Sequence, residues 1–180
     1  MKAWPVILLA LVAACGEGRA IFNVDVHSFL AGTGSDTVPY VIPVGLTDTL
    51  QSPARQINLP PGLSNSIVDS VRITTGGADL VNTAGTGSIG FQLYIAADAA
   101  GALSPSALAI NIPAAAVNGA QTVSVAITGD LSPALNSLFT REAIFVSVGA
   151  VGTNGGAVPV TGQMVLTSLQ VRVVIKEQIF

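Results

Sequence analysis

Cys15 and His27 are the only cysteine and the only histidine in this chain. A histidine-based metal site usually takes two or more imidazoles or cysteine partners. A hydrolytic triad needs a base, which only His27 could supply, and no Gly-x-Ser-x-Gly turn accompanies it. We therefore expect no catalytic residue, no metal ligand and no cofactor, and a protein that is not an enzyme. His27 follows Asp25 on the polar side of an alternating run, and we expect it to be an exposed strand residue.

The acidic side chains are the remaining candidates for chemistry. Asp36, Asp48, Asp98 and Asp130 lie in turn-like sequence, where aspartate ordinarily forms turns and helix caps. A pair of carboxylates for glycoside hydrolysis stays open, because a separation in space cannot be read from the sequence. No Asp-x-Asp-x-Asp pattern indicates a calcium loop.

The glycines at 85, 87 and 90 have the spacing of a Gly-x-Gly-x-x-Gly phosphate loop. In such a loop the glycines open a helix, whose N-terminus holds the phosphate. Here they lead into an alternating apolar run instead, so we expect a hairpin and no phosphate site.

The first fifteen residues have the pattern of a targeting segment. Lys2 is followed by an uninterrupted apolar run from Trp4 to Ala14, which at eleven residues is too short to span a bilayer. It fits the hydrophobic region of a secretory signal peptide. Two small residues, Ala13 and Ala14, come directly before Cys15. A single cysteine cannot form an internal disulfide, which favours a different use for Cys15.

Val12-Ala13-Ala14-Cys15 resembles the lipobox of bacterial lipoproteins. The resemblance implies a signal peptide at 1–14, a diacylglycerol on Cys15, and a mature chain tethered through 15–19 to a domain at 20–180. It also implies an extracytoplasmic, lipid-anchored protein. Gly16 stands where an Asp would retain enterobacterial lipoproteins in the inner membrane, so the outer membrane is favoured. The alternative is an ordinary signal peptide with an unrelated cysteine.

Composition limits the function classes. Half of the residues are hydrophobic, 9% are charged and the formal net charge is −3. This hydrophobicity is not that of a disordered chain. The few basic residues are scattered singly, which argues against nucleic-acid binding.

Alternation of apolar and polar residues with period two predicts an all-β domain. It is clearest at 22–27, 70–74, 89–95, 122–127, 144–148 and 169–176, and weaker strands are expected at 38–44, 54–59, 78–82 and 106–112. Turns are expected at 32–36, 60–62, 76–77, 85–87, 118–119 and 154–156. We predict a single antiparallel β-sandwich of about nine or ten short strands.

One short crossover helix is expected within residues 130–139. Ser132 could cap it, Pro133 suits its first turn, and Leu135, Leu138 and Phe139 would face the core.

The low charge is the remaining clue to function. Between Ala96 and Thr140 the only charged residues are Asp98 and Asp130, and the apolar stretches 99–103 and 112–117 would be exposed if they lay in loops. Large exposed apolar patches often mark contact surfaces, although a genome rich in Ala, Gly and Val codons would give the same composition. We expect a binding or structural module of the cell envelope, possessing a membrane anchor and an envelope protein partner. The alternative is a carrier of a lipid or another hydrophobic ligand between the two sheets.

Overall fold

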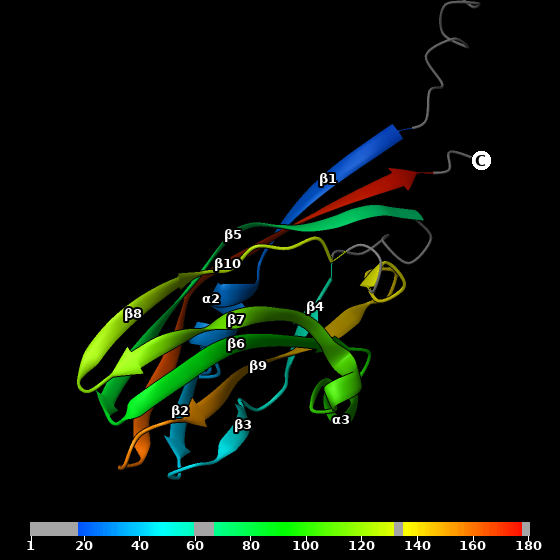
Figure 1. Cartoon of the computed structure of the whole chain (residues 1–180). Helices are drawn as coiled ribbons and strands as arrows, with labels where there is room; N and C mark the ends of the chain where they lie inside the picture. The colour runs from blue at the N-terminus through cyan, green and yellow to red at the C-terminus, as the bar shows by residue number, and fades with distance from the viewer. Residues whose placement is uncertain (1–17, 60–66, 132–134, 178–180) are drawn as a thin grey trace, which may run out of the picture.

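A computed structural model describes residues 18–59, 67–131 and 135–177, and in this part the chain is an all-β sandwich of two antiparallel five-stranded sheets. Figure 1 shows the two sheets packed face to face. The predicted fold class is therefore confirmed. The first sheet, called sheet A, contains β1 (Gly18–Asp25), β2 (Thr37–Ile42), β5 (Ile67–Ala84), β8 (Gln121–Ala126) and β10 (Val160–Glu177). The second, sheet B, contains β3 (Thr47–Gln51), β4 (Arg55–Asn58), β6 (Thr86–Ala96), β7 (Leu108–Asn118) and β9 (Ala143–Asn154).

Each sheet is organised around one long strand. In sheet A, β10 pairs along one side with β5 and along the other first with β2 and then with β1. In sheet B, β9 pairs with β6 on one side and with β3 and β4 on the other. β8 extends sheet A beyond β5, and β7 extends sheet B beyond β6. Segments far apart in sequence thus fix both sheets.

Two of the strands are far longer than the sequence pattern predicts. β5 and β10 have 18 residues each, and β5 continues through Gly76 and Gly77, where we expected a turn. A Cβ on Gly76 would lie 2.5 Å from the carbonyl oxygen of Ile127. The register of β10 against β5 also shifts beside Gly77, between Leu166 and Ser168. The two glycines therefore allow a close backbone approach and a bulge, which is the other common role of glycine in a strand.

The first strand ends earlier than expected, and this changes the place of His27. β1 begins at Gly18, before the predicted domain start at Ala20, and ends at Asp25. Asp25 then caps α2 (Val26–Ala31) by accepting a hydrogen bond from the Ser28 backbone at 3.2 Å. His27 is half-buried in this helix, so its assignment to an exposed strand is wrong. The strand ends at Asp25 because this residue caps the helix that follows.

The expected crossover helix lies only partly within the described residues. Ser132 and Pro133, its predicted cap and first residue, lie outside them. Phe139 donates its backbone N–H to the carbonyl of Leu135 at 3.3 Å, and both side chains are buried. The segment connects β8 to β9, as predicted. Short helices that we did not predict occur elsewhere, at α3 (Ala99–Ala102) and η2 (Pro105–Ala107).

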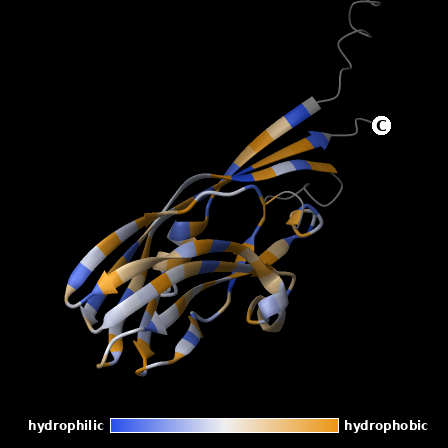
Figure 2. Cartoon of the chain, in the orientation of Figure 1, coloured by the Kyte–Doolittle hydropathy of each residue, from blue (hydrophilic) through white to orange (hydrophobic). Residues whose placement is uncertain are grey.

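The core lies between the sheets as one contiguous apolar cluster. Its largest fully buried side chains include Tyr40, Phe91 and Phe139. Figure 2 shows apolar and polar residues alternating along the strands, as expected when one face of each sheet packs inward. Among the described residues no helix is long and apolar enough to cross a membrane.

Candidate functional site

The predicted lipidation site, Cys15, lies outside the described residues. The structure does place the start of the strand that follows it. Gly18, the first residue of β1, is paired with Glu177, the last residue of β10. We call this end of sheet A the proximal end; Figure 1 shows β1, β5 and β10 projecting there beyond sheet B.

The polar residues singled out in the sequence do not come together in the described part of the chain. No group of three His, Cys, Asp or Glu residues there could hold a metal ion. Asp98 caps α3 and accepts from the Gly101 backbone at 2.7 Å, which confirms its predicted capping role. Asp130 forms an ion pair with Arg72 at 3.4 Å. Asp48 lies within strand β3, so its expected place in a turn is wrong, and its Oδ1 accepts a hydrogen bond from the backbone of Thr49 at 2.8 Å.

The remaining acid and the glycine motif are also accounted for. Asp36 lies in the loop between α2 and β2, and its carbonyl oxygen accepts a hydrogen bond from Leu166 at 2.8 Å. The stretch 85–90 leads into a strand, as predicted, but β6 begins at Thr86, so Thr86 and Gly87 belong to the strand and not to the turn that we expected at 85–87. The expected hairpin is not formed here, because β5 and β6 belong to different sheets. Gly85 has a positive φ of 83°, and a Cβ there would lie 2.4 Å from the carbonyl oxygen of Pro159. Gly85 thus forms a tight turn against a neighbouring loop.

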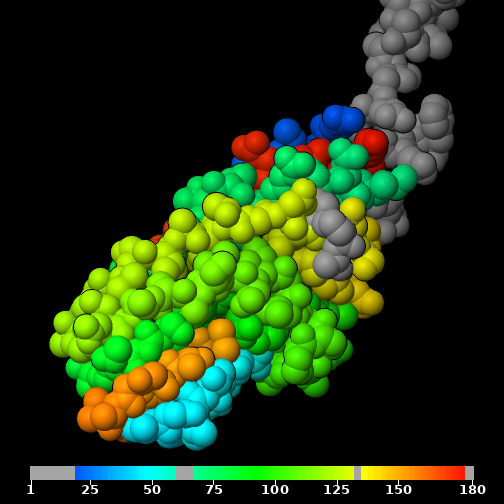
Figure 3. Space-filling model, in the orientation of Figure 1, coloured from blue at the N-terminus to red at the C-terminus, as the bar shows by residue number. Residues whose placement is uncertain are grey.

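Four connections of the two sheets meet at the opposite end of the molecule. They are residues 43–46, 85, 119–120 and 155–159. The strand register brings them together, because Ala84 pairs with Thr161, Thr86 with Asn118 and Gly87 with Asn154. We call these four connections the distal tip. Figure 3 shows its cyan and orange parts, 43–46 and 155–159, side by side at the lower edge of the molecule.

A buried asparagine holds the two longer loops of the distal tip. The side chain of Asn154 is only 3% exposed. Its Nδ2 donates to the carbonyl oxygens of Ile42 at 3.0 Å and of Val158 at 2.9 Å, and its Oδ1 accepts from the backbone of Gly156 at 2.8 Å. One side chain therefore joins the end of β2 to the loop before β10.

A second buried asparagine holds the two shorter turns. Nδ2 of Asn82 lies 3.1 Å from the carbonyl oxygen of Ala84, 3.3 Å from that of Gly85 and 2.6 Å from that of Gly119. Its Oδ1 accepts from the hydroxyl of Tyr40 at 3.3 Å. Burial raises the pKa of Tyr40 to about 12, because the interior disfavours the phenolate. The side chains of Asn82 and Asn154 thus stabilise the distal tip from inside, and their polar groups are hydrogen-bonded.

The outer surface of the distal tip is apolar and carries no charge. Val44, Leu46 and Val158 are each about half exposed (50%, 54% and 55%), and none of the residues in the four connections is charged. Exposed aliphatic side chains on rigid loops are typical of contact surfaces, because rigid loops lose little conformational entropy on binding. The distal tip is the candidate functional site.

The apolar stretches flagged in the sequence lie mainly in α3 and β7, yet only Ala102 and Val117 of their eleven residues are buried. Residues 112–117 lie within β7, not in a loop, and Val117 is buried. In 99–103, Ala102 is buried beneath α3, while Leu103 is exposed. Leu103 and Leu108 line a hollow of about 360 Å³ on sheet B. These stretches are therefore parts of regular elements that keep an exposed apolar surface.

Sequence reasoning flagged 154–156 as a loop but missed the bracing role of Asn82 and Asn154. It also did not single out 43–46, although Pro43 and Gly45 are turn residues that could have marked this connection. No sequence signal distinguishes a buried, bonded asparagine from an exposed one.

No protein-family model matches the chain, and no curated protein matches it in sequence. The comparison with solved structures finds chains from infectious bursal disease virus. For the Gx strain the identity is 10% and the TM-score 0.44, with 91% of this chain and 38% of that chain covered. For the Gt strain the identity is 14% and the TM-score 0.39, with 90% and 38% covered. The chain thus spans less than half of the length of these viral chains.

Proposed function

We propose that the chain is a bacterial lipoprotein, anchored to a membrane through Cys15 and facing an extracytoplasmic space, that acts as a non-enzymatic binding or structural module of the cell envelope. The observation that carries this proposal is the opposite placement of the proximal end and the distal tip. β10 runs from Val160, beside the distal tip, to Glu177 at the proximal end. Its 18 residues cover about 60 Å along their path.

This geometry suits a chain tethered at its N-terminal side. Gly18 is already in β1, so the tether after Cys15 is very short and keeps the proximal end next to the bilayer. The distal tip is then the part of the domain held farthest from the anchor. Gly16 after the cysteine favours the outer membrane, by the same resemblance that indicates lipidation.

The distal tip fits a protein partner because of its chemistry. Burying the exposed parts of Val44, Leu46 and Val158 would contribute about 1 kcal/mol each. Together this corresponds to roughly a hundredfold in affinity. No charge in these loops would have to be desolvated.

The alternative, a carrier of a lipid or another hydrophobic ligand between the sheets, has less support. The inner faces of both sheets contribute to one packed cluster in which Leu80, Phe91 and Ile127 are fully buried. A ligand between the sheets would have to displace side chains of this kind.

Native mass spectrometry of the protein purified gently from membranes tests the proposal. We expect an acylated chain with a stoichiometric protein companion. The triple variant V44S/L46S/V158S should lose the companion, while L103S, which changes an exposed leucine away from the tip, should keep it. An acylated chain that carries only lipid would favour the carrier, and a companion retained by the triple variant would overturn the role of the distal tip.

A further inference from the structure

Cationic side chains gather at the proximal end. The described residues contain six Arg and Lys residues, and four of them lie where β1, β10 and β5 run side by side. These four are Arg19, Arg72, Arg172 and Lys176. The other two belong to the sheet B side: Arg55 lies in β4 and Arg141 precedes β9. Three carboxylates, those of Asp25, Asp69 and Asp130, lie on the same part of sheet A, so the four cations leave a small excess of positive charge in a chain whose net charge is −3.

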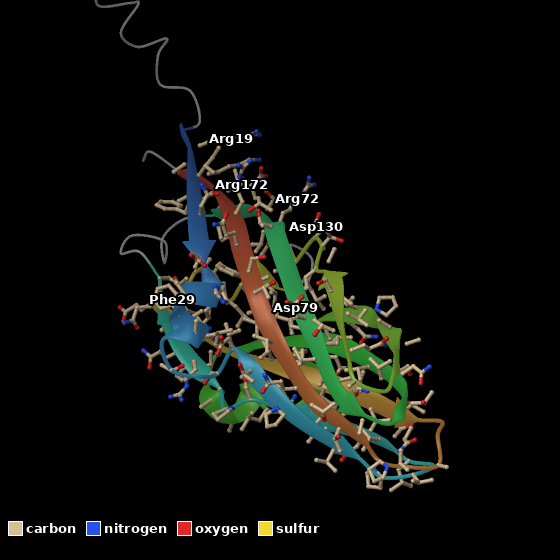
Figure 4. The ribbon with its side chains drawn as sticks, turned by 90° about the vertical axis from the view of Figure 1, so that its left-hand side faces the viewer. Arg19, Phe29, Arg72, Asp79, Asp130 and Arg172 are labelled. Atoms are coloured by element: carbon tan, nitrogen blue, oxygen red, sulfur yellow. The ribbon has the colours of Figure 1, made fainter. Side chains whose placement is uncertain are left out.

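The strand register places the four cations on one face. Arg19 is opposite Lys176, and Arg172 is opposite Arg72; directly opposite residues project from the same side of a sheet. On β10, Arg172 and Lys176 alternate with Val173 and Ile175, which are buried in the core. The cations therefore lie on the outer face of sheet A. Figure 4 shows Arg19, Arg72 and Arg172 gathered near the start of β1.

Two of the four cations form ion pairs with a carboxylate of the described residues, and two do not. Lys176 Nζ lies 3.2 Å from Asp69 Oδ1, and Arg72 Nε lies 3.4 Å from Asp130 Oδ2. Arg172 Nε donates to the amide oxygen of Asn23 at 3.4 Å. Within the described ranges, neither Arg19 nor Arg172 forms an ion pair with a carboxylate. Arg172 shares a surface hollow with Asp25, so Arg19 and Arg172 can still contact an external anion, with the Asp25 carboxylate nearby.

Exposed aliphatic side chains accompany the cations. Ile21 follows Arg19 on the outer side of β1 and is 60% exposed, and Ile67, opposite Lys176, is 51% exposed. Arginine and lysine interleaved with exposed aliphatic residues are the composition of surfaces that lie at a lipid headgroup layer.

We propose that this basic face (Arg19, Ile21, Ile67, Arg72, Arg172 and Lys176) binds the anionic headgroup surface of a lipid bilayer. The inference rests on the proposed function, because an anchor at Cys15 brings Arg19 within about 14 Å of the lipid. Arg19 and Arg172, which form no ion pair with a described carboxylate, attract lipid phosphates, and the two isoleucines enter the headgroup layer. This second contact determines which side of sheet A faces the membrane, and it thereby sets the orientation of the distal tip relative to the bilayer.

Flotation with vesicles tests the basic face without the anchor. All strands and buried core residues of the described part lie between Gly18 and Glu177, so a chain that starts at Gly16 keeps the fold. This unlipidated chain should float with vesicles of phosphatidylcholine and phosphatidylglycerol in equal parts, and not with phosphatidylcholine alone. Added salt should release it, because salt screens exposed charges.

A charge-matched pair of variants locates the contact. R19Q/R172Q should lower the binding constant for the mixed vesicles about 25-fold, at about fivefold for each cation near the surface. R55Q/R141Q removes the same charge from the sheet B side and should leave the constant nearly unchanged; circular dichroism confirms that both variants are folded.

Three outcomes would overturn this inference: no flotation of the unlipidated chain, equal flotation with neutral vesicles, or equal losses in the two variants. The proposal of a lipid anchor is tested separately, by the mass of the chain isolated from membranes. The two proposals can therefore fail independently.

Discussion

Asn154 donates a hydrogen bond at 3.0 Å to the carbonyl oxygen of Ile42, a residue 112 positions earlier in the chain. The contact joins the last residue of β9 in sheet B to the last residue of β2 in sheet A. Because the same Nδ2 also reaches Val158, two loops of the distal tip depend on one side chain. The shape of the candidate contact surface is therefore set from the interior.

Asn154→Ala should destabilise the protein by about 3 kcal/mol, because it removes three hydrogen bonds and leaves buried carbonyl groups without a donor. Urea unfolding measures the change. The control is Asn111→Ala, at an exposed asparagine of β7 whose side chain accepts a hydrogen bond from Gln92 at 3.3 Å; it should cost less than about 0.5 kcal/mol. Equal losses in the two variants would contradict the bracing role of Asn154.

Gly85→Ala should cost clearly more than Gly119→Ala, although both residues have a positive φ. An added Cβ at Gly119 meets nothing within 4 Å, whereas at Gly85 it lies 2.4 Å from the Pro159 carbonyl oxygen. We expect a loss of about 1 kcal/mol at Gly119 from backbone strain alone. At Gly85 the loss should be about 3 kcal/mol or more, from strain and the clash together. Thermal unfolding of the two variants gives the comparison, and similar melting temperatures would mean that the loops do not pack as described.

The buried phenol of Tyr40 predicts a loss of stability in alkali. Its pKa is raised from 10.0 to about 12 in the folded protein, so the folded state keeps the proton that the unfolded chain gives up. This contribution is complete below pH 10 and is lost as the pH rises from 10 towards 12. It amounts to about 3 kcal/mol.

Denaturant unfolding of the wild type and of Tyr40→Phe across this pH range isolates the effect, because other titrating groups are common to both proteins. The wild type should lose its stability relative to Tyr40→Phe as the pH rises. Parallel curves for the two proteins would show that the phenol is not buried in the folded state.

The sequence predicted the fold class because alternation is a local property that each strand displays by itself. β6, β9 and the second half of β10 were found in this way. β3 was missed because its residues Thr47–Gln51 are all exposed or half-buried, which leaves no apolar alternation. The length of β5 was missed because Gly76 and Gly77 serve a close approach of Ile127, which is a tertiary contact.

The candidate sites were less predictable than the fold. The apolar residues of the distal tip are separated by more than a hundred positions, from Val44 to Val158, and only the register of β2 and β9 against their partners brings them together. The basic face has the same origin, since its cations are scattered singly along the sequence. Pairing of β1, β10 and β5 converts this scatter into one surface.

The central claim, that Cys15 anchors this domain to a membrane, is tested most directly by mass spectrometry of the N-terminal peptide from protein isolated from cell membranes. The account predicts a chain that begins at Cys15, carries a diacylglycerol on the thiol, and leaves the membrane fraction when Cys15 is changed to Ala. A chain that begins elsewhere, or a Cys15 with a free thiol, would contradict it.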